Sequence, residues 1–419
     1  MITHFRHIAL LIVFAAAALV AAPEDFYLKN GDRVVFYGDS ITEQRLYTTF
    51  AETYVLTRFP KLNVSFVHSG WGGDRVTGGG GGTIDVRLKR DVFAYKPTVM
   101  TIMLGMNDGS YRAFDQGIFD TYANGYRDII KSVKKTLPGI RITVLQPSPY
   151  DDVTREPGFP GGYNAVLVRY ASFVADLAKE ENLNVADLNT PVVAALVKAK
   201  AADPELARRI IPDRVHPGAG GHLLMAAALL KSWNAPAVVT SVAIDAANRR
   251  VTEALNTAVS ELKAEGGGLT WVQADRALPM PLNQKDRALM LAVQSSDFME
   301  TINRQPLKVT GLGEGRYSLS IDGEKVGTFT SRELAEGINL ASLATPMAAQ
   351  AAAVHDLTLK HNNIHYSRWR QVQVPLEDLK LKTIQPAMDA LDKLEAEIVL
   401  QQRAQAQPKT RAYRLAPEQ

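Results

Sequence analysis

The sequence predicts an α/β protein in which a parallel sheet, covered by helices on both faces, is followed by a small β-rich part and a helical C-terminal region. From Asp32 to about Asn234, short β-branched runs alternate with helical segments. After Pro236 the runs are short and alternate between apolar and polar residues, and from about Pro346 helical spacing returns. A chain of 419 residues exceeds the usual size of one hydrophobic core, so we expect several domains.

The expected strands of the parallel sheet are apolar runs that each end in Gly, Asn, Asp or Pro. Near-continuous hydrophobicity is typical of strands that are buried on both faces. The runs are RVVFYG, LNVSFVHSG, TVMTIMLGMND, IRITVLQPSPY and LNVADLN. Between several of them lie amphipathic segments whose apolar residues recur at helical spacing, such as FDTYANGYRDIIKSVKKTL and LVRYASFVADLAKEEN.

Residues 238–345 contain short alternating runs that predict strands, and the Asp322–Gly323 pair predicts a hairpin turn. The runs are VVTSVAIDA, LTWVQA, LKVTGL and GRYSLSIDGEKVGTFT. Here only VTEALNTAVSELKAE has a convincing helical pattern. Two further helices are expected after Pro346, in MAAQAAAVHDLTLKHNNIHYSRWRQ and MDALDKLEAEIVLQQRAQ, and we expect the last dozen polar residues to fray.

The predicted domain organisation has four parts. They are a signal peptide at 1–22, an α/β domain at 23–235, a β-rich accessory domain at 236–345 and a helical C-terminal region with a polar tail at 346–419. The N-terminal segment MITHFRHIALLIVFAAAALVAA has the basic residue, apolar run and small residues of a secretory signal. Its apolar run is shorter than the roughly 20 residues that span a membrane, so we expect cleavage and no integral membrane span afterwards. A bacterial secreted or periplasmic location follows.

Composition and charge exclude some functional classes. The chain has 46% hydrophobic and 22% charged residues, which is ordinary for globular proteins. Its 47 Lys and Arg residues nearly balance 44 Asp and Glu residues, and no clustered basic face is evident, so a nucleic-acid partner is not expected. There is no cysteine, so the mature protein has no disulfide.

Five residues of the α/β domain could support chemistry. Ser40 follows an apolar run in RVVFYGDSITEQ, Gly73 lies in HSGWGGDRV, and Asn107 lies in LGMNDG. Asp213 and His216 are three apart in IPDRVHPGAGGHL. Taken singly, each fits a turn, a helix cap or a loop residue. The carboxyl ends of parallel strands, however, are where α/β folds bind ligands.

Together these residue types supply what acyl transfer requires. A serine hydroxyl is a weak nucleophile until a base takes its proton, and His216 has the side chain suited to that role near neutral pH. Asp213 can orient the imidazole and stabilise its charged form. The backbone N–H groups of Ser40 and Gly73 and the side-chain amide of Asn107 are suitable donors to an oxyanion.

The four sequence blocks resemble the SGNH (GDSL-type) hydrolase family in type and in order, over about residues 30–235. GDS supplies Ser40, GWGGD supplies Gly73 in preference to the nearby Gly70 and Gly72, GMND supplies Asn107, and DRVH supplies Asp213 and His216. The resemblance implies a three-layer α/β/α flavodoxin-like fold, a shallow open site, and ester hydrolysis that needs no metal or other cofactor.

The expected substrate is an acylated small molecule or carbohydrate. Export and a β-rich accessory domain favour a carbohydrate acetylesterase. No long hydrophobic lid is evident near the motifs, which argues against a long-chain lipase. Another SGNH activity, such as a lysophospholipase or thioesterase, is the nearer alternative. A non-catalytic carbohydrate-binding protein is the more distant one, and the complete set of five residues argues against it.

Two features of the C-terminal region allow more than one interpretation. His361 and His365 are four residues apart and could bind a metal from one helix face, but there is no Glu between them and a third ligand is not evident, so a structural or surface role is favoured. In HYSRWRQ, Arg368, Trp369 and Arg370 could face a glycan or pack the helices against another domain. Packing is favoured, because an aromatic residue at helical spacing usually belongs to a core.

Overall fold

The computed structural model describes residues 25–418, so the predicted signal peptide at 1–22 lies outside the described residues. The first part contains a five-stranded, fully parallel sheet with the strand order β2-β1-β5-β6-β7. Its strands are β1 (Arg33–Gly38), β2 (Ser65–Gly70), β5 (Val99–Met103), β6 (Arg141–Leu145) and β7 (Asn184–Ala186). The register pairs Gly38 with both Gly70 and Met103, so three strands end together at one edge.

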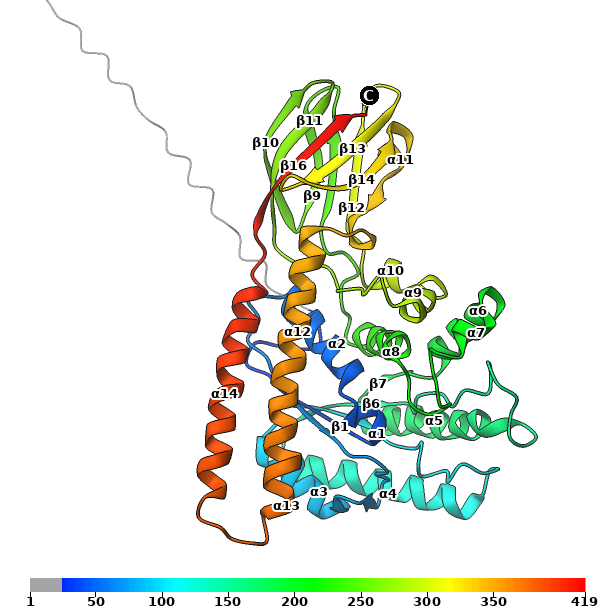
Figure 1. Cartoon of the computed structure of the whole chain (residues 1–419). Coiled ribbons are helices and arrows are strands. Elements are labelled where there is room, and N and C mark those ends of the chain that lie inside the picture. The colour runs from blue at the N-terminus through cyan, green and yellow to red at the C-terminus, as the bar shows by residue number, and fades with distance from the viewer. Residues whose placement is uncertain (1–24, 419) are drawn as a thin grey trace, which may run out of the picture.

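Helices cover both faces of this sheet (Figure 1). Helices α2 and α8 pack together on one face, and α4 and α5 pack together on the other. Helix α8 is buried along almost its whole length because α9 (Arg287–Gln294) covers its outer side. The predicted three-layer α/β/α fold is therefore confirmed. The remaining elements of this part are α1 (Ser40–Glu43), α2 (Leu46–Arg58), β3 (Gly78–Gly79), β4 (Gly82–Thr83), α3 (Ile84–Asp91), η1 (Phe93–Tyr95), α4 (Gln116–Thr136), α5 (Gly162–Glu181), α6 (Thr190–Ala202), α7 (Pro204–Ala207) and α8 (Ala219–Ser232).

The β-rich part is a sandwich of two sheets, with strand orders β10-β11-β16-β13-β14 and β15-β12-β8-β9. Apolar side chains from both sheets, including the stacked rings of Trp271 and Tyr413, form its core. Its elements are β8 (Ser241–Asp245), β9 (Arg250–Leu255), β10 (Thr257–Glu265), β11 (Gly268–Asp275), β12 (Pro306–Thr310), β13 (Arg316–Ile321), β14 (Glu324–Thr330), α11 (Ser331–Glu336), β15 (Ile338–Asn339), η2 (Leu340–Ser342) and β16 (Thr410–Pro417). The short helix α10 (Phe298–Thr301) lies between β11 and β12 in the sequence but packs against α8 of the α/β part. The predicted hairpin at Asp322–Gly323 joins β13 to β14.

Two expectations for this part are wrong. The segment VTEALNTAVSELKAE is not helical but forms most of β9 and β10, because each strand pairs with a neighbour in a sheet and tertiary pairing outweighs helix propensity. The last residues do not fray, because β16 lies between β11 and β13 and buries Tyr413 and Leu415. The predicted domain boundaries at residues 235 and 345 stay a prediction. The structure adds β16, from the C-terminal end, to the sheets of the β-rich part.

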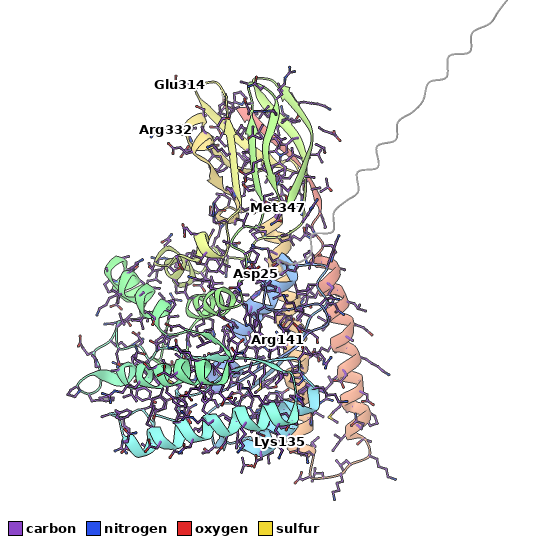
Figure 2. The ribbon with its side chains drawn as sticks, turned by 180° about the vertical axis from the view of Figure 1, so that it is seen from behind. Asp25, Lys135, Arg141, Glu314, Arg332 and Met347 are labelled. Atoms are coloured by element: carbon purple, nitrogen blue, oxygen red, sulfur yellow. The ribbon has the colours of Figure 1, made fainter. Side chains whose placement is uncertain are left out.

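The C-terminal region forms a long antiparallel helical pair that runs along the side of the α/β part (Figure 1). Its elements are α12 (Pro346–Tyr366), the π-helical segment η3 (Ser367–Gln373), α13 (Val374–Leu376) and α14 (Ile384–Gln405). Helix α12 packs against α2. Figure 2 shows Met347, at the start of α12, where the β-rich part meets the α/β part. Within residues 25–418, no helix has the length and apolar character needed to cross a membrane.

A buried polar network fixes this helical pair to α2. The His361 imidazole donates to the Glu52 carboxylate across 2.6 Å, and both side chains are 3% exposed. Glu52 also contacts His68 and Gln402. Among residues 25–418, no group of three or more His, Cys, Asp or Glu side chains is arranged to hold a metal. His361 therefore pairs with a carboxylate at a helix interface, as the favoured structural role predicts.

Candidate active site

The turn after β1 presents Ser40 at the edge where three strands end. A side chain at Gly38 would collide with Thr42 and with the carbonyl oxygen of Met103. The close packing at the end of β1 therefore requires glycine at this position. The Asp39 carboxylate accepts the Ile41 N–H at 3.0 Å and caps α1. Ser40 is consequently the first residue of α1, with a half-buried side chain.

A hydrogen-bonded chain joins Ser40 to the loop before α8. His216 Nε2 lies 2.9 Å from Ser40 Oγ, and His216 Nδ1 lies 2.7 Å from Asp213 Oδ2. The other oxygen of Asp213 accepts the backbone N–H groups of Val215 and His216 at 3.0 and 2.7 Å. These contacts fix the carboxylate and hence the orientation of the imidazole. In this arrangement Nδ1 carries the proton and Nε2 is free to accept one from the serine.

The electrostatics of this chain suit an anionic Asp213. Partial burial opposes its ionisation, but hydrogen bonds from His216 and Val215 outweigh burial and hold the pKa of Asp213 below its usual value. The Asp213 side chain is 57% exposed and that of His216 is 35% exposed, so the site is open to solvent. By contrast, burial and then the nearby carboxylates Asp108 and Asp74 raise the pKa of Asp39 to about 7.

The glycine block follows β2 and lies beside α1. Gly72 donates its backbone N–H to Glu43 Oε2 at 2.9 Å, and a side chain at Gly72 would meet that carboxylate. Gly73 has φ of +78°, a left-handed conformation that favours glycine. Within residues 25–418, the backbone N–H groups of Ser40 and Gly73 donate no hydrogen bond. The structure thus leaves both predicted backbone donors available to a ligand.

Asn107 follows β5, and two contacts orient its side-chain amide. Its Nδ2 donates to the carbonyl oxygen of Asp74 at 3.1 Å, and its Oδ1 accepts the hydroxyl of Tyr111 at 2.9 Å. One N–H of the amide remains for another acceptor. Asp74 follows Gly73 directly, so the bond to its carbonyl joins the Asn107 amide to the glycine block.

Tyr111 was not predicted to belong to the site. Both Ser110 and Tyr111 have positive φ, at 57° and 54°, and this uncommon pair of left-handed residues turns the Tyr111 hydroxyl toward Asn107. The Tyr111 ring is 43% exposed, and among residues 25–418 no other aromatic side chain is in the exposed class. Its centroid lies 5.1 Å from that of Tyr163 and 6.3 Å from that of Tyr150. No sequence pattern around Tyr111 indicates this contact.

Glu43 also lies at the site without having been predicted, although its position gave a signal. It is three residues after Ser40 in a short helix, a spacing that places both side chains on one helix face. Its carboxylate contacts Gly72 and also Arg370 from the C-terminal helical region. The five predicted residues therefore lie in one connected site: Ser40, His216 and Asp213 by direct hydrogen bonds, and Gly73 and Asn107 through their neighbours.

Comparisons with known proteins find a matching family model and similar proteins. Residues 36–224 match the model of the GDSL-like Lipase/Acylhydrolase family. An acetylxylan esterase from Geobacillus stearothermophilus is 24% identical over 229 residues, which cover 48% of this chain and 94% of that protein. A solved structure of a catalytic mutant of an acetylxylan esterase from the same organism covers 49% of this chain and 96% of its own, at 22% identity and a TM-score of 0.41.

A second solved structure resembles nearly the whole chain. It is described as a gut microbial diltiazem-metabolizing enzyme, with 26% identity and a TM-score of 0.81, and the match covers 93% of this chain and 98% of that one. The β-rich and helical parts are thus included in this similarity. From the matched family model and the sheet described above, residues 36–224 belong to the GDSL-like lipase/acylhydrolase family, and the chain carries an SGNH hydrolase domain.

Proposed function

We propose that this protein is an exported serine esterase that removes small acyl groups, above all acetyl, from a carbohydrate. The main observation behind the catalytic proposal is the hydrogen-bonded series Asp213, His216 and Ser40, with contacts of 2.7 Å between Asp213 and His216 and 2.9 Å between His216 and Ser40. Membership of an acylhydrolase family is consistent with ester substrates. The signal-peptide pattern at residues 1–22 supports export.

In the proposed reaction, Ser40 Oγ attacks the ester carbonyl while His216 Nε2 takes its proton. The carbonyl oxygen becomes an oxyanion and accepts hydrogen bonds from the N–H groups of Ser40 and Gly73 and from Asn107 Nδ2. The imidazolium, stabilised by Asp213, then gives its proton to the departing alcohol. Water repeats the sequence on the acyl-serine, releasing the acid and restoring Ser40.

Three observations support a carbohydrate acetyl ester as the substrate. The solvent-exposed His216 and Asp213 side chains border an open site that can admit part of a polymer. The exposed ring of Tyr111, beside Asn107, offers an apolar face to the ring of a bound sugar. One matched relative is named an acetylxylan esterase.

The test is a substrate panel with a nucleophile variant. Purified protein is assayed on acetylated xylan, pectin and xyloglucan, on diltiazem, and on p-nitrophenyl esters of increasing chain length. We expect acetate release from at least one polysaccharide and the fastest p-nitrophenyl hydrolysis at two carbons, all lost in Ser40→Ala. Activity confined to long acyl chains or thioesters would instead favour the lysophospholipase or thioesterase alternative.

The non-catalytic alternative, a carbohydrate-binding protein, has less support. The large aromatic rings of the β-rich part, Trp271 and Tyr413, are each 2% exposed and stack on each other in its core. They offer no ring face to a glycan. Binding of acetylated xylan by Ser40→Ala protein, with no turnover by the wild type, would favour that alternative.

A further inference from the structure

We propose that Arg370, from the C-terminal helical region, is a positioning residue for the oxyanion-binding glycine turn and acts through Glu43. This inference rests on the proposed function and assigns a role at the site to a residue outside the matched family domain of 36–224. It makes the helical pair a part of the active site.

The first step is the bridge made by the Glu43 carboxylate. Its Oε2 accepts the Gly72 N–H at 2.9 Å, and its Oε1 lies 3.3 Å from Arg370 Nε. Glu43 shares α1 with Ser40, so this one carboxylate joins the nucleophile's helix, the glycine turn and the C-terminal region. The side chains of Arg370 and Glu43 are 28% and 22% exposed, which makes the pair better shielded than an ordinary surface ion pair.

The second step is the stacking of Arg370 on Trp71, the residue before Gly72. The guanidinium carbon lies 3.4 Å from the centroid of the Trp71 ring, close enough for a planar cation–π contact. Trp71 is 4% exposed, and Trp369 contacts it edge-on with centroids 5.7 Å apart. The backbone N–H of Trp71 donates to the carbonyl of Gly38 at 2.9 Å. The residue that enters the glycine turn is therefore held between β1 and two successive residues of the C-terminal region.

The third step is a second line of contacts from the same segment. Trp369 Nε1 donates to Asp91 Oδ1 at 2.6 Å, and Asp91 pairs with Arg87. Arg87 Nε in turn donates to Asp74 Oδ2 at 2.7 Å. Since the carbonyl of Asp74 accepts the Asn107 amide, Trp369 and Arg370 reach the glycine block from both of its ends.

The local helix geometry explains how two neighbouring residues can do this. Residues Ser367–Gln373 form a π-helical segment, which interrupts the α-helical repeat between α12 and α13. Such segments are rare and occur frequently at functional sites. Here Trp369 is buried, whereas Arg370 lies at the half-buried edge of the site.

The test compares Arg370→Gln with the matched control Arg368→Gln. Arg368 belongs to the same segment but pairs with Asp392 of α14 and does not contact the glycine turn. Three quantities are measured: the rate constant for phosphonylation of Ser40 by a fluorophosphonate, and kcat and KM for p-nitrophenyl acetate. Because small misplacements of catalytic groups can cost up to about 100-fold, we expect Arg370→Gln to lower both the labelling rate and kcat by about 10-fold, with KM unchanged. Arg368→Gln should leave all three at wild-type values.

A double-mutant cycle tests the route through Glu43. In a Glu43→Ala background, Arg370→Gln should cause a smaller loss than in the wild type, because the carboxylate link to Gly72 is gone and only the stack on Trp71 remains to be lost. Arg370→Lys, which keeps the charge but loses the planar stack, should fall between wild type and Arg370→Gln.

Three results would overturn the proposal. They are an unchanged labelling rate in Arg370→Gln, an effect confined to KM, which would indicate direct substrate contact, and an undiminished effect in the Glu43→Ala background. Circular dichroism of each variant separates misfolding from misplacement. If wild-type protein is not labelled at Ser40 at all, the proposed function itself fails, which is a distinct outcome.

Discussion

Replacing Tyr111 with Phe removes one hydroxyl from the site and leaves the ring in place. That hydroxyl donates to Asn107 Oδ1 at 2.9 Å and so fixes the amide whose Nδ2 is proposed to bind the oxyanion. A neutral hydrogen bond contributes about 1 kcal/mol, which corresponds to about 5-fold in rate. We therefore expect kcat to fall by about 5-fold while KM stays the same. This is much less than the 100- to 1,000-fold typical of losing an oxyanion donor outright, which we expect for Asn107→Ala.

The assay is steady-state hydrolysis of p-nitrophenyl acetate and of an acetylated xylo-oligosaccharide by wild type, Tyr111→Phe, Asn107→Ala and the double variant. Tyr150→Phe is the matched control. Tyr150 lies beside Tyr111, but within residues 25–418 the Tyr150 hydroxyl makes no hydrogen bond. Because Tyr111 acts through Asn107, its substitution should have no further effect in Asn107→Ala. An unchanged kcat in Tyr111→Phe, or a 5-fold loss that persists without Asn107, would refute the reasoning.

Three further predictions follow from the site and the helical interface. Gly73→Ala should lower kcat while the protein stays folded, because a side chain has space there but strains a backbone at φ +78° by about 1–2 kcal/mol; wild-type kcat would contradict this. His361→Leu should lower the free energy of unfolding by about 3 kcal/mol at pH 6, because it leaves Glu52 buried without its charged partner; urea unfolding measures the loss. Burial opposes the charge on His361, but Glu52 and Glu395 outweigh it and raise its pKa to about 10, so the folded state keeps a proton that the unfolded state loses near pH 6.5. The stability difference between wild type and His361→Leu should therefore be full below pH 6.5 and shrink as the pH rises toward 10; a constant difference would exclude the charged pair.

Much of the α/β part could be predicted because its signals are local. Each buried strand is a short apolar run that ends in a turn residue, and parallel strands bring those ends to one edge of the sheet. This is why Ser40 and Asn107, far apart in sequence, are expected at one edge of the sheet, and in the structure Ser40 contacts His216 there while Asn107 contacts the glycine block through Asp74.

The errors arose where long-range pairing decides the structure. Residues 251–265 are rich in Ala, Leu and Glu, which favour a helix, yet sheet neighbours hold them as β9 and β10. The alternation of Tyr413 and Leu415 is too short to be informative alone, and the strands beside β16 lie far from it in the sequence. Likewise, the contact of Arg370 with Glu43 joins residues 327 positions apart, and nothing local in either segment indicates it.

The most direct test of the central claim is to find which residue reacts with a fluorophosphonate. Wild-type protein is labelled, digested and analysed by peptide mass spectrometry beside Ser40→Ala and His216→Ala. We expect one adduct, on Ser40, that is absent in Ser40→Ala and forms far more slowly in His216→Ala, because the base that lies 2.9 Å from Ser40 Oγ is missing. An adduct on another residue, or equal labelling of the wild type and Ser40→Ala, would contradict it.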